Sequence, residues 1–461
     1  MSEAPNSQQS VPNTTANTNA PPPPVGTDTT ARNARHPGVA LVLQGGGARA
    51  AYQAGVLQAV CELLGNPKTS PFPIITGTSA GAINAAVLAS HADDFTLGVS
   101  KLVKVWENFS PAQVYRVDVR GVFINTFKWL RAIVFSGSKR NERVSLFDNS
   151  PLPESIAKVT NLSGIEAHIK SGALRAWCVT CAGYTSGQNV AFFHGADDLT
   201  GWRRSQRVGI RVSSLRMEHL LASAAIPFAF PAVKINREYF GDGSIRQTSP
   251  LSPALHLGAQ RIFVVGTAKL VKDFPKRVRS ELYPSLAQIA GHAMSSIFLD
   301  TLAVDIELLQ RLNSTLAMVT PERLKQSGSA LQHVDVLVAC PNEPLETLAY
   351  ENVNRLPWTI RLLLRFIGAM RRGGSALTSY LLFDSHYCTA LIDLGYKDTM
   401  ARGDEVRQFF DPEICPMPTR IPTANFDPGA TIQIRAYQPG ESTQMRAYAD
   451  DDDRDDTRSS N

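Results

Sequence analysis

Residues 72–81 read Phe-Pro-Ile-Ile-Thr-Gly-Thr-Ser-Ala-Gly, and this stretch decides the fold class. An apolar run leads into a Gly-x-Ser-x-Gly sequence, in which Gly77 and Gly81 flank Ser79, and an alanine-rich run follows over 82–90. A strand that turns sharply into a helix needs glycine beside the turn, because a Cβ atom there would meet crowded backbone. The stretch therefore predicts a strand, a tight turn and a helix, with the Ser79 hydroxyl near the positive end of that helix. An ordinary glycine-rich turn has the same residues, so the motif needs support from elsewhere in the chain.

A second strand, loop and helix lie upstream. An apolar run over 38–44 leads into Gly45-Gly46-Gly47-Ala48-Arg49, and a helical pattern follows over 50–64. Three successive glycines leave backbone N–H groups free to bind an anion. A dinucleotide site would need glycine in place of Ala50 and an acidic residue about twenty positions on, and a phosphate-binding loop would need Gly-Lys-Ser/Thr. Neither pattern is present, so an oxyanion hole that serves a serine nucleophile fits best.

A third motif, Asp242-Gly243-Ser244, follows an aromatic pair. Aspartate beside glycine is common in turns, so the motif carries little weight alone. A histidine is the alternative partner for the serine, and His194, His219 and His256 are the candidates. His256 follows Asp242 in the chain order of Ser-Asp-His hydrolases, but it lies in a helical pattern over 253–258, where a structural role is more common.

Taken together, the three motifs resemble those of bacterial patatin-like phospholipases in order and spacing. The resemblance covers about residues 38–265, and the segments 146–152 and 222–228 agree with it. It implies a lipid acyl hydrolase with a Ser-Asp dyad rather than a triad. Two positions differ from the usual family pattern: Ala50 stands where glycine follows the arginine, and Ser244 stands where glycine or alanine completes the aspartate motif.

Carried over to this sequence, the resemblance implies a role for each motif. Ser79 is the expected nucleophile and Asp242 its activating partner. The oxyanion hole is expected at Gly45, Gly46, Gly47 and Arg49, of which the glycines contribute backbone N–H groups and Arg49 is the basic residue that follows. Gly77 and Gly81 shape the nucleophile turn, and Gly243 and Ser244 complete the aspartate motif.

The expected function is therefore that of a serine carboxylic-ester hydrolase, a phospholipase or esterase that passes through an acyl-serine intermediate. The expected substrate is a lipid acyl ester, and the chemistry requires no metal and no cofactor. Two alternatives stay open. One is a hydrolase of another acyl ester or thioester, and the other is an inactive or weakly active lipid-binding or scaffolding protein.

Strand-like and helical runs alternate along the chain and predict an α/β, three-layer sandwich with a mainly parallel central sheet, plus a helical C-terminal region. Ser79 then lies at the carboxyl end of its strand, where such sheets carry their sites. The expected strands are 39–44, 72–76, 175–182, 189–194, 261–266 and 333–339. Four segments are expected: a disordered one over 1–36, a patatin-like catalytic domain over 37–266, a helical region with a further strand over 267–410, and an extended acidic tail over 411–461.

The helical region contains two long helical patterns, over 285–318 and 375–394. Two other segments, 123–140 and 357–372, are basic and amphipathic, a pattern typical of interfacial helices. The alternative is a packing helix whose arginines reach past apolar surface to solvent. For the first segment, which includes Trp129 and Phe135, we expect a lid or a wall of the acyl channel.

Charge indicates the kind of surface that the protein meets. The chain of 461 residues carries a net charge of +5. The last twelve residues hold six aspartates and two arginines, a net of −4, so the remainder carries about +9. This bias favours peripheral contact with an anionic membrane over nucleic acid, since no aromatic-basic recognition motif is present. The oligomeric state stays open.

Six cysteines are spread along the chain, and the only close pair is Cys178 and Cys181. A strand would place these two side chains on opposite faces, so we expect reduced core thiols. The N-terminal segment lacks a basic start and an apolar run, and so is no Sec signal peptide. Prolines and glycines interrupt the longest uncharged stretch, 69–92, so it is better explained by the strand and helix around Ser79 than by a membrane span. We expect a cytoplasmic, membrane-peripheral protein, with non-Sec export left open.

Overall fold

The computed structural model describes residues 38–118, 124, 127, 145–270, 286–296, 301–326, 331–366, 368–370 and 374–411. The chain divides into a large unit over 1–421 and a second unit over 422–461, and the second lies outside the described residues. The same holds for the N-terminal segment 1–36, for the acidic tail beyond 411, for Cys415, and for the amphipathic segment 123–140 apart from two isolated positions.

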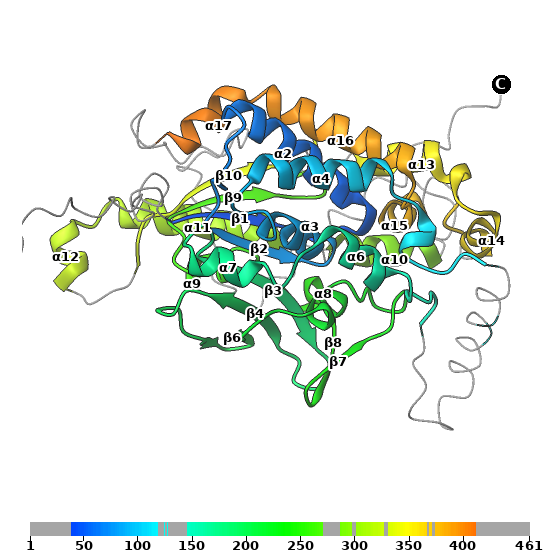
Figure 1. The fold of residues 1–461 in the computed structure, drawn as a ribbon, viewed down its shortest axis with the longest axis horizontal. Helices are drawn as coiled ribbons and strands as arrows, with labels where there is room; N and C mark the ends of the chain where they lie inside the picture. Colours follow the sequence, from blue (N-terminus) through cyan, green and yellow to red (C-terminus); the bar gives the residue numbers. More distant parts are fainter. Residues whose placement is uncertain are drawn as a thin grey trace, which may run out of the picture. The chain divides into compact units, whose positions relative to one another are not determined.

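A ten-stranded sheet forms the centre of the large unit (Figure 1). The strands are β1 (Val39–Leu43), β2 (Ile74–Thr78), β3 (Ala176–Gly183), β4 (Asn189–Gly195), β5 (Trp202–Arg204), β6 (Arg207–Arg211), β7 (Val233–Ile235), β8 (Glu238–Asp242), β9 (Arg261–Val265) and β10 (Asp335–Ala339). Their order is β10-β9-β1-β2-β3-β4-β6-β5, and β8 pairs with both β3 and β7. The pairs from β10 to β3, and β4 with β6, are parallel, whereas the others are antiparallel. The sheet is therefore mixed and mainly parallel, as predicted.

Helices flank the sheet along the described part of the chain. They are α2 (Ala51–Leu63), α3 (Ala80–Ala89), α4 (Phe95–Glu107), α6 (Leu152–Val159), α7 (Ile165–Lys170), α8 (Met217–Ser223), α9 (Ser252–His256), α10 (Leu286–Ser295), α11 (Thr301–Leu316), α12 (Pro321–Gln326), α13 (Leu345–Asn352), α14 (Trp358–Phe366), α15 (Ser375–Leu381), α16 (Ser385–Met400) and α17 (Gly403–Phe410). Short 3₁₀ turns, η1 (Gly47–Ala50), η2 (Pro111–Gln113), η3 (Gly243–Arg246) and η5 (Val353–Arg355), join some of them. Among the described residues, no helix is both long and apolar enough to cross a membrane.

The two faces of the sheet carry separate hydrophobic cores. Along β1, Val39, Leu41 and Leu43 enter the larger core, and Ala40 and Val42 enter the smaller one. This alternation follows from the two-residue period of a strand. Helices α2, α3, α4 and α16 contribute to the larger core, and α9 and α11 contribute to the smaller one. The predicted three-layer arrangement is confirmed, with α2, α4 and α16 together on one side of the sheet in Figure 1.

The C-terminal helical region is built into the same unit. Strand β10 extends the sheet beside β9, and α16 lies along α2. A Cβ atom on Gly55 would collide with the carbonyl oxygen of Ile392, and one on Gly395 would collide with that of Tyr52. Glycine at both positions lets the two helices approach closely. The described segments on both sides of residue 266 thus lie within one compact unit.

The six predicted strands are present, with ends shifted by at most two residues. Four further strands, β5 to β8, were not predicted from the sequence, and each is only three to five residues long. The helix predicted over 375–394 is two helices, because the chain turns at 382–384. There the side chain of Asp384 accepts hydrogen bonds from the N–H groups of His386 and Tyr387 and caps α16. The pattern over 285–318 likewise comprises α10 and α11.

Candidate active site

Ser79 occupies the turn between β2 and α3 that the sequence predicts. Its backbone has φ 56° and ψ −131°, a region that residues other than glycine rarely adopt. A Cβ atom on Gly77 would meet the backbone of Gly81 and Ala82. One on Gly81 would meet carbonyl oxygens at the end of β1. Both glycines are thus required by close backbone approach, and the strained serine lies at the amino end of α3.

Strand pairing brings Asp242 to the same place. Strand β3 lies between β2 and β8, with Thr180 opposite Thr78 and Cys181 opposite Asp242. The last residue of β8 is therefore only two strands from the turn that holds Ser79. A Cβ atom on Gly243 would collide with the carbonyl oxygen of Thr180, so the glycine after the aspartate keeps this approach close.

The Asp242 carboxyl group is fully buried. One oxygen, Oδ1, accepts a hydrogen bond from the N–H of Ser244 at 2.9 Å. The other, Oδ2, has no hydrogen-bond partner in the described part of the chain. Burial raises the pKa of Asp242 to about 6, and interactions with the Ser79 hydroxyl and with Ser244 oppose this rise. The interaction with Ser79 thus affects the carboxyl group without forming a hydrogen bond of regular geometry to Oδ2.

Ser223, at the end of α8, ties the turn to β3. Its Oγ accepts a hydrogen bond from the backbone N–H of Ser79 at 2.8 Å and donates one to the carbonyl oxygen of Thr180 at 2.6 Å. No motif in the sequence assigns this serine a role. Ser223 is separated from Ser79 by 144 positions in the chain, so no local pattern could have indicated the contact.

The glycine loop follows β1 and approaches Ser79. In the described part of the chain, the N–H groups of Gly46 and Gly47 make no hydrogen bond. Gly47 has φ 53°, and a Cβ atom on it would collide with the carbonyl oxygen of Tyr380. The Thr267 hydroxyl donates to the carbonyl oxygen of Gly45 at 2.6 Å and fixes the loop from the other side. The loop therefore has free donors in a constrained backbone, which is what an oxyanion hole requires.

Arg49 belongs to this loop, but its side chain is fully buried against the C-terminal helices. The guanidinium donates to Ser379 at 2.8 Å and to Glu346 at 2.7 Å, and it lies 4.1 Å from the centre of the Tyr380 ring. Burial alone would lower the pKa of Arg49, but Tyr380 and Glu346 raise it overall. Arg49 therefore anchors the glycine loop to α13 and α15 through its side chain.

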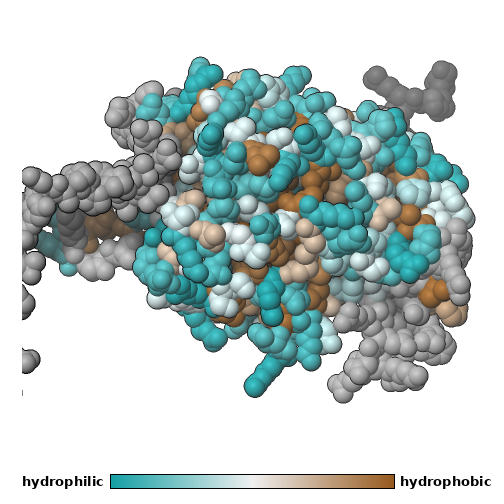
Figure 2. Space-filling view, viewed as in Figure 1, coloured by the Kyte–Doolittle hydropathy of each residue, from teal (hydrophilic) through white to brown (hydrophobic). Residues whose placement is uncertain are grey.

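A pocket opens beside Ser79 and encloses about 670 Å³, counting its solvent-open part. Its lining is almost entirely apolar and comes mainly from α3, α4, α6 and the segment after α8. The residues are Gly47, Ser79, Ala80, Ile83, Asn84, Val87, Leu102, Val105, Trp106, Phe109, Val114, Leu152, Ser155, Ile156, Val159, Ala224, Ile226, Phe230 and Phe383. Figure 2 shows hydrophobic residues among hydrophilic ones on the face where these helices lie. A pocket with this lining is typical of a site for an apolar ligand.

Buried polar side chains connect the pocket wall to the glycine loop. Trp106 Nε1 donates to Asn84 Oδ1 at 3.0 Å, and Asn84 Nδ2 donates to Gln53 Oε1 at 2.9 Å. Gln53 Nε2 in turn donates to the carbonyl oxygen of Gln44 at 2.7 Å, directly before the loop. Because these polar groups satisfy one another, the wall presents an apolar surface to the pocket.

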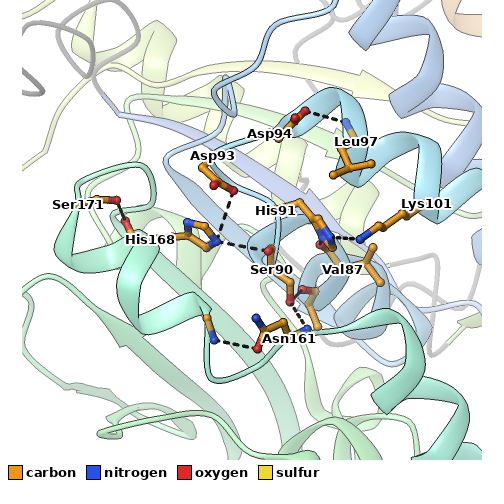
Figure 3. Close-up of polar contacts among 12 residues, drawn as sticks. Val87, Ser90, His91, Asp93, Asp94, Leu97, Lys101, Asn161, His168 and Ser171 are labelled. Carbon is orange, nitrogen blue, oxygen red and sulfur yellow. Dashed lines mark hydrogen bonds and ion pairs between the residues drawn. The ribbon is translucent and has the colours of Figure 1, made fainter.

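Polar contacts also hold the carboxyl end of α3 (Figure 3). Ser90 Oγ donates to the carbonyl oxygen of Ala86 at 2.7 Å and accepts from the N–H of Asn161 at 3.1 Å. Lys101 Nζ lies 2.9 Å from His91 Nε2, and His168 Nε2 lies 3.5 Å from Asp93. The helix that follows Ser79 is therefore held at both ends.

The three candidate histidines have partners other than Ser79 and Asp242. His194 Nδ1 lies 3.0 Å from the carbonyl oxygen of Val212, and His219 Nδ1 accepts from the N–H of Arg216 at 3.0 Å. His256 stacks on Trp202, and burial lowers the pKa of both His219 and His256. Within the described ranges, none of the three hydrogen-bonds to Ser79 or Asp242.

Cysteines contribute no metal site in the part of the chain that the structure describes, where no group of three or more His, Cys, Asp or Glu could hold an ion. Cys178 and Cys181 enter opposite cores, as the strand prediction required. Burial raises the pKa of both thiols above their ordinary value. Both therefore act as buried core residues.

Residues 41–255 match the model of the patatin-like phospholipase family. No curated protein matches the chain. Among solved structures, the crystal structure of VipD from Legionella pneumophila matches with 13% sequence identity, over 77% of this chain and 67% of that chain, at a TM-score of 0.24. A TM-score this low supports no argument about fold or function.

Proposed function

Since the chain belongs, through residues 41–255, to the patatin-like phospholipase family, whose members are lipid acyl hydrolases, we propose that Ser79 and Asp242 form its catalytic dyad. The observation that carries the proposal is the environment of Asp242. Its carboxyl group is fully buried, interacts with the Ser79 hydroxyl, and keeps one oxygen without a hydrogen-bond partner in the described part of the chain. An unpaired buried carboxyl oxygen is costly for stability and is therefore rare unless it has a role.

In the first half of the reaction, Ser79 Oγ attacks the ester carbonyl carbon while Asp242 takes the hydroxyl proton. The carbonyl oxygen becomes an oxyanion, and the free N–H groups of Gly46 and Gly47 donate hydrogen bonds to it. The amino end of α3 adds a favourable field at the same point. The bond from carbon to the leaving oxygen then breaks, and that oxygen receives the proton from Asp242.

In the second half, water attacks the acyl-Ser79 ester and gives its proton to Asp242. The Ser79 Oγ then leaves and recovers that proton, which releases a free fatty acid and the starting enzyme. The raised pKa of Asp242 suits both halves, because a carboxylate with a pKa of about 6 is a stronger base than an ordinary aspartate. No histidine and no metal takes part in this scheme.

The apolar pocket provides the acyl site. Ile83 and Val87 follow Ser79 along the same face of α3 and line the pocket together with Trp106. Eight residues of helix span roughly 12 Å, so the pocket extends well beyond the ester group. A lipid acyl chain can therefore lie along α3 with its ester at Ser79. The substrate is then drawn from a lipid surface, and the net charge of about +9 that the chain carries outside its last twelve residues favours an anionic one.

Acyl release tests the proposal. Wild type should hydrolyse short-chain chromogenic esters and release fatty acid from phospholipid vesicles, and Ser79→Ala should do neither. A folded Asp305→Asn variant is a matched control, because Asp305 is also a buried aspartate with a raised pKa, located on α11 away from the site. Wild-type protein without activity on either substrate would contradict the proposal, as would full activity in Ser79→Ala.

A further inference from the structure

Helix α14 has two apolar faces, and only one of them is used in packing. Ile360 and Leu364 are buried in the larger core. The Thr359 hydroxyl donates to the carbonyl oxygen of Val117 at 3.0 Å, which fixes this face of the helix. On the other face Trp358, Leu362 and Phe366 are 55%, 36% and 81% exposed. Their spacing of four residues aligns them in one stripe along the helix.

Unpaired positive charge borders this stripe. Arg361 and Arg365 lie one turn apart beside Trp358, and α14 contains no acidic residue. Neither arginine forms an ion pair within the described residues, whereas Arg49, Arg311 and Arg402 each pair with a glutamate. Exposed aromatic residues beside free arginines are the pattern of a helix that lies in a membrane interface, where the rings enter the headgroup region and the guanidinium groups meet lipid phosphates.

The position of α14 connects this face to the pocket. Val117, which accepts the hydrogen bond from Thr359, is three residues from Val114 in the pocket wall. On the other side, the Thr378 hydroxyl of α15 donates to the carbonyl oxygen of Ala369 just beyond α14. Phe383, which follows α15, also lines the pocket. Figure 1 shows α14 and α15 together at one end of the sheet.

We propose that the exposed face of α14, formed by Trp358, Leu362, Phe366 and Arg365 with the half-buried Arg361 at its border, docks the protein on an anionic lipid surface. Charge complementarity selects this occupant over a neutral surface, because neither arginine forms an ion pair within the described residues and α14 itself has no acidic residue. The benefit of docking rests on the proposed hydrolase function, because docking would bring lipid esters to the pocket. The binding itself requires no catalysis.

Vesicle sedimentation tests the proposal with the full-length protein. The probes are phosphatidylcholine vesicles with and without phosphatidylglycerol, and the variants are Trp358→Ser/Phe366→Ser and Arg361→Gln/Arg365→Gln. We expect the aromatic variant to bind anionic vesicles at least tenfold more weakly than wild type. We expect the arginine variant to lose roughly 25-fold on the same vesicles, at about fivefold for each arginine.

Helix α11 offers a matched control. Val304 and Leu308 are 62% and 55% exposed at the same spacing, but their neighbours Glu307 and Arg311 form an ion pair. Val304→Ser/Leu308→Ser should therefore bind anionic vesicles as wild type does. Circular dichroism and thermal melting would establish that each variant is folded.

Three results would overturn the proposal: wild-type binding in the α14 variants, an equal loss in the α11 control, or no preference of the wild type for anionic vesicles. If wild type shows no preference for anionic vesicles, and the α14 substitutions instead weaken its binding to another protein, the face would be assigned to a protein partner. Hydrolysis of a short-chain monomeric ester, which needs no membrane, should be unchanged in all variants. Failure of wild type in that assay would refute the hydrolase proposal and leave the docking result standing.

Discussion

The hydroxyl of Ser223 accepts a hydrogen bond from the backbone N–H of Ser79 at 2.8 Å. Because the same hydroxyl donates to Thr180 in β3 at 2.6 Å, it fixes the strained turn to the strand that lies between Ser79 and Asp242. A single side chain thus links the turn that holds Ser79 to the strand that also pairs with the end of β8 at Asp242.

We predict that Ser223→Ala lowers kcat more than it changes KM. The change leaves the buried N–H of Ser79 without its partner and removes one hydrogen bond from the carbonyl oxygen of Thr180, which should cost about 1–3 kcal/mol of unfolding free energy. Ser90→Ala is the matched control, because Ser90 makes the same pair of hydrogen bonds at the other end of α3. Urea unfolding should show a similar loss of stability in both variants, and steady-state kinetics should show a loss of kcat in Ser223→Ala only. Equal kinetic effects would mean that Ser223 has no specific influence on the turn.

We predict that kcat/KM falls as the pH drops below about 6. The proposed base is the Asp242 carboxylate, and burial raises the pKa of that group to about 6, so protonation below this pH removes the base. A pH profile on a soluble ester would measure the apparent pKa. Because a histidine titrates in the same range, the profile should be repeated with His219→Gln and His256→Gln, and both should keep the same acidic limb. Loss of the limb in either variant would assign the base to that histidine.

We predict that Asp242→Asn raises stability at neutral pH. The folded protein keeps the Asp242 proton up to a pH of about 6, whereas the unfolded chain loses it near the ordinary value of 3.8. Below 3.8 the group contributes nothing, and stability falls as the pH rises from 3.8 to about 6. Asparagine does not titrate, so at pH 7 the free energy of unfolding of the variant should exceed that of wild type by roughly 3 kcal/mol. Urea unfolding at pH 4 and pH 7 should show a difference from wild type that grows with pH, and a difference that shrinks with pH would contradict the raised pKa.

We predict that Gly47→Ala disrupts the glycine loop. An added Cβ would collide with the carbonyl oxygen of Tyr380, and the φ of 53° is strained for alanine. Gly65→Ala is the control, because its φ of 73° imposes a similar strain but its Cβ would meet no atom within 4 Å. The control should lose about 1–2 kcal/mol of unfolding free energy from backbone strain alone. Gly47→Ala should lose more, along with esterase activity, and equal losses would show that the approach of α15 to the loop is not important.

Much of this architecture could be predicted from local patterns. Short-range periodicity and glycine placement predict the strand before Ser79 and the glycine loop. They also predict that Cys178 and Cys181 lie on opposite faces of their strand. The contacts of Ser223 and Arg49 could not be predicted, because their partners lie 144 and about 300 residues away in the chain. The break at 382–384 was missed because the apolar pattern of α15 continues into α16, and only the capping role of Asp384 marks the turn.

The packing of the C-terminal region could not be predicted from local patterns either. Strand β10 follows a long helical segment, and its parallel register with β9 depends on tertiary packing. Glycine at positions 55 and 395 allows α16 to approach α2, but the sequence offers each glycine only as a weak point in a helix. Both features place the C-terminal region in the same compact unit as the site.

Covalent labelling with a fluorophosphonate probe, followed by peptide mapping, tests the central claim most directly. The account predicts a single labelled peptide that contains Ser79, no labelling of Ser79→Ala, greatly reduced labelling of a folded Asp242→Asn, and normal labelling of Asp305→Asn. Label on a different residue, or undiminished labelling after Ser79→Ala, would contradict the assignment of Ser79 as the nucleophile.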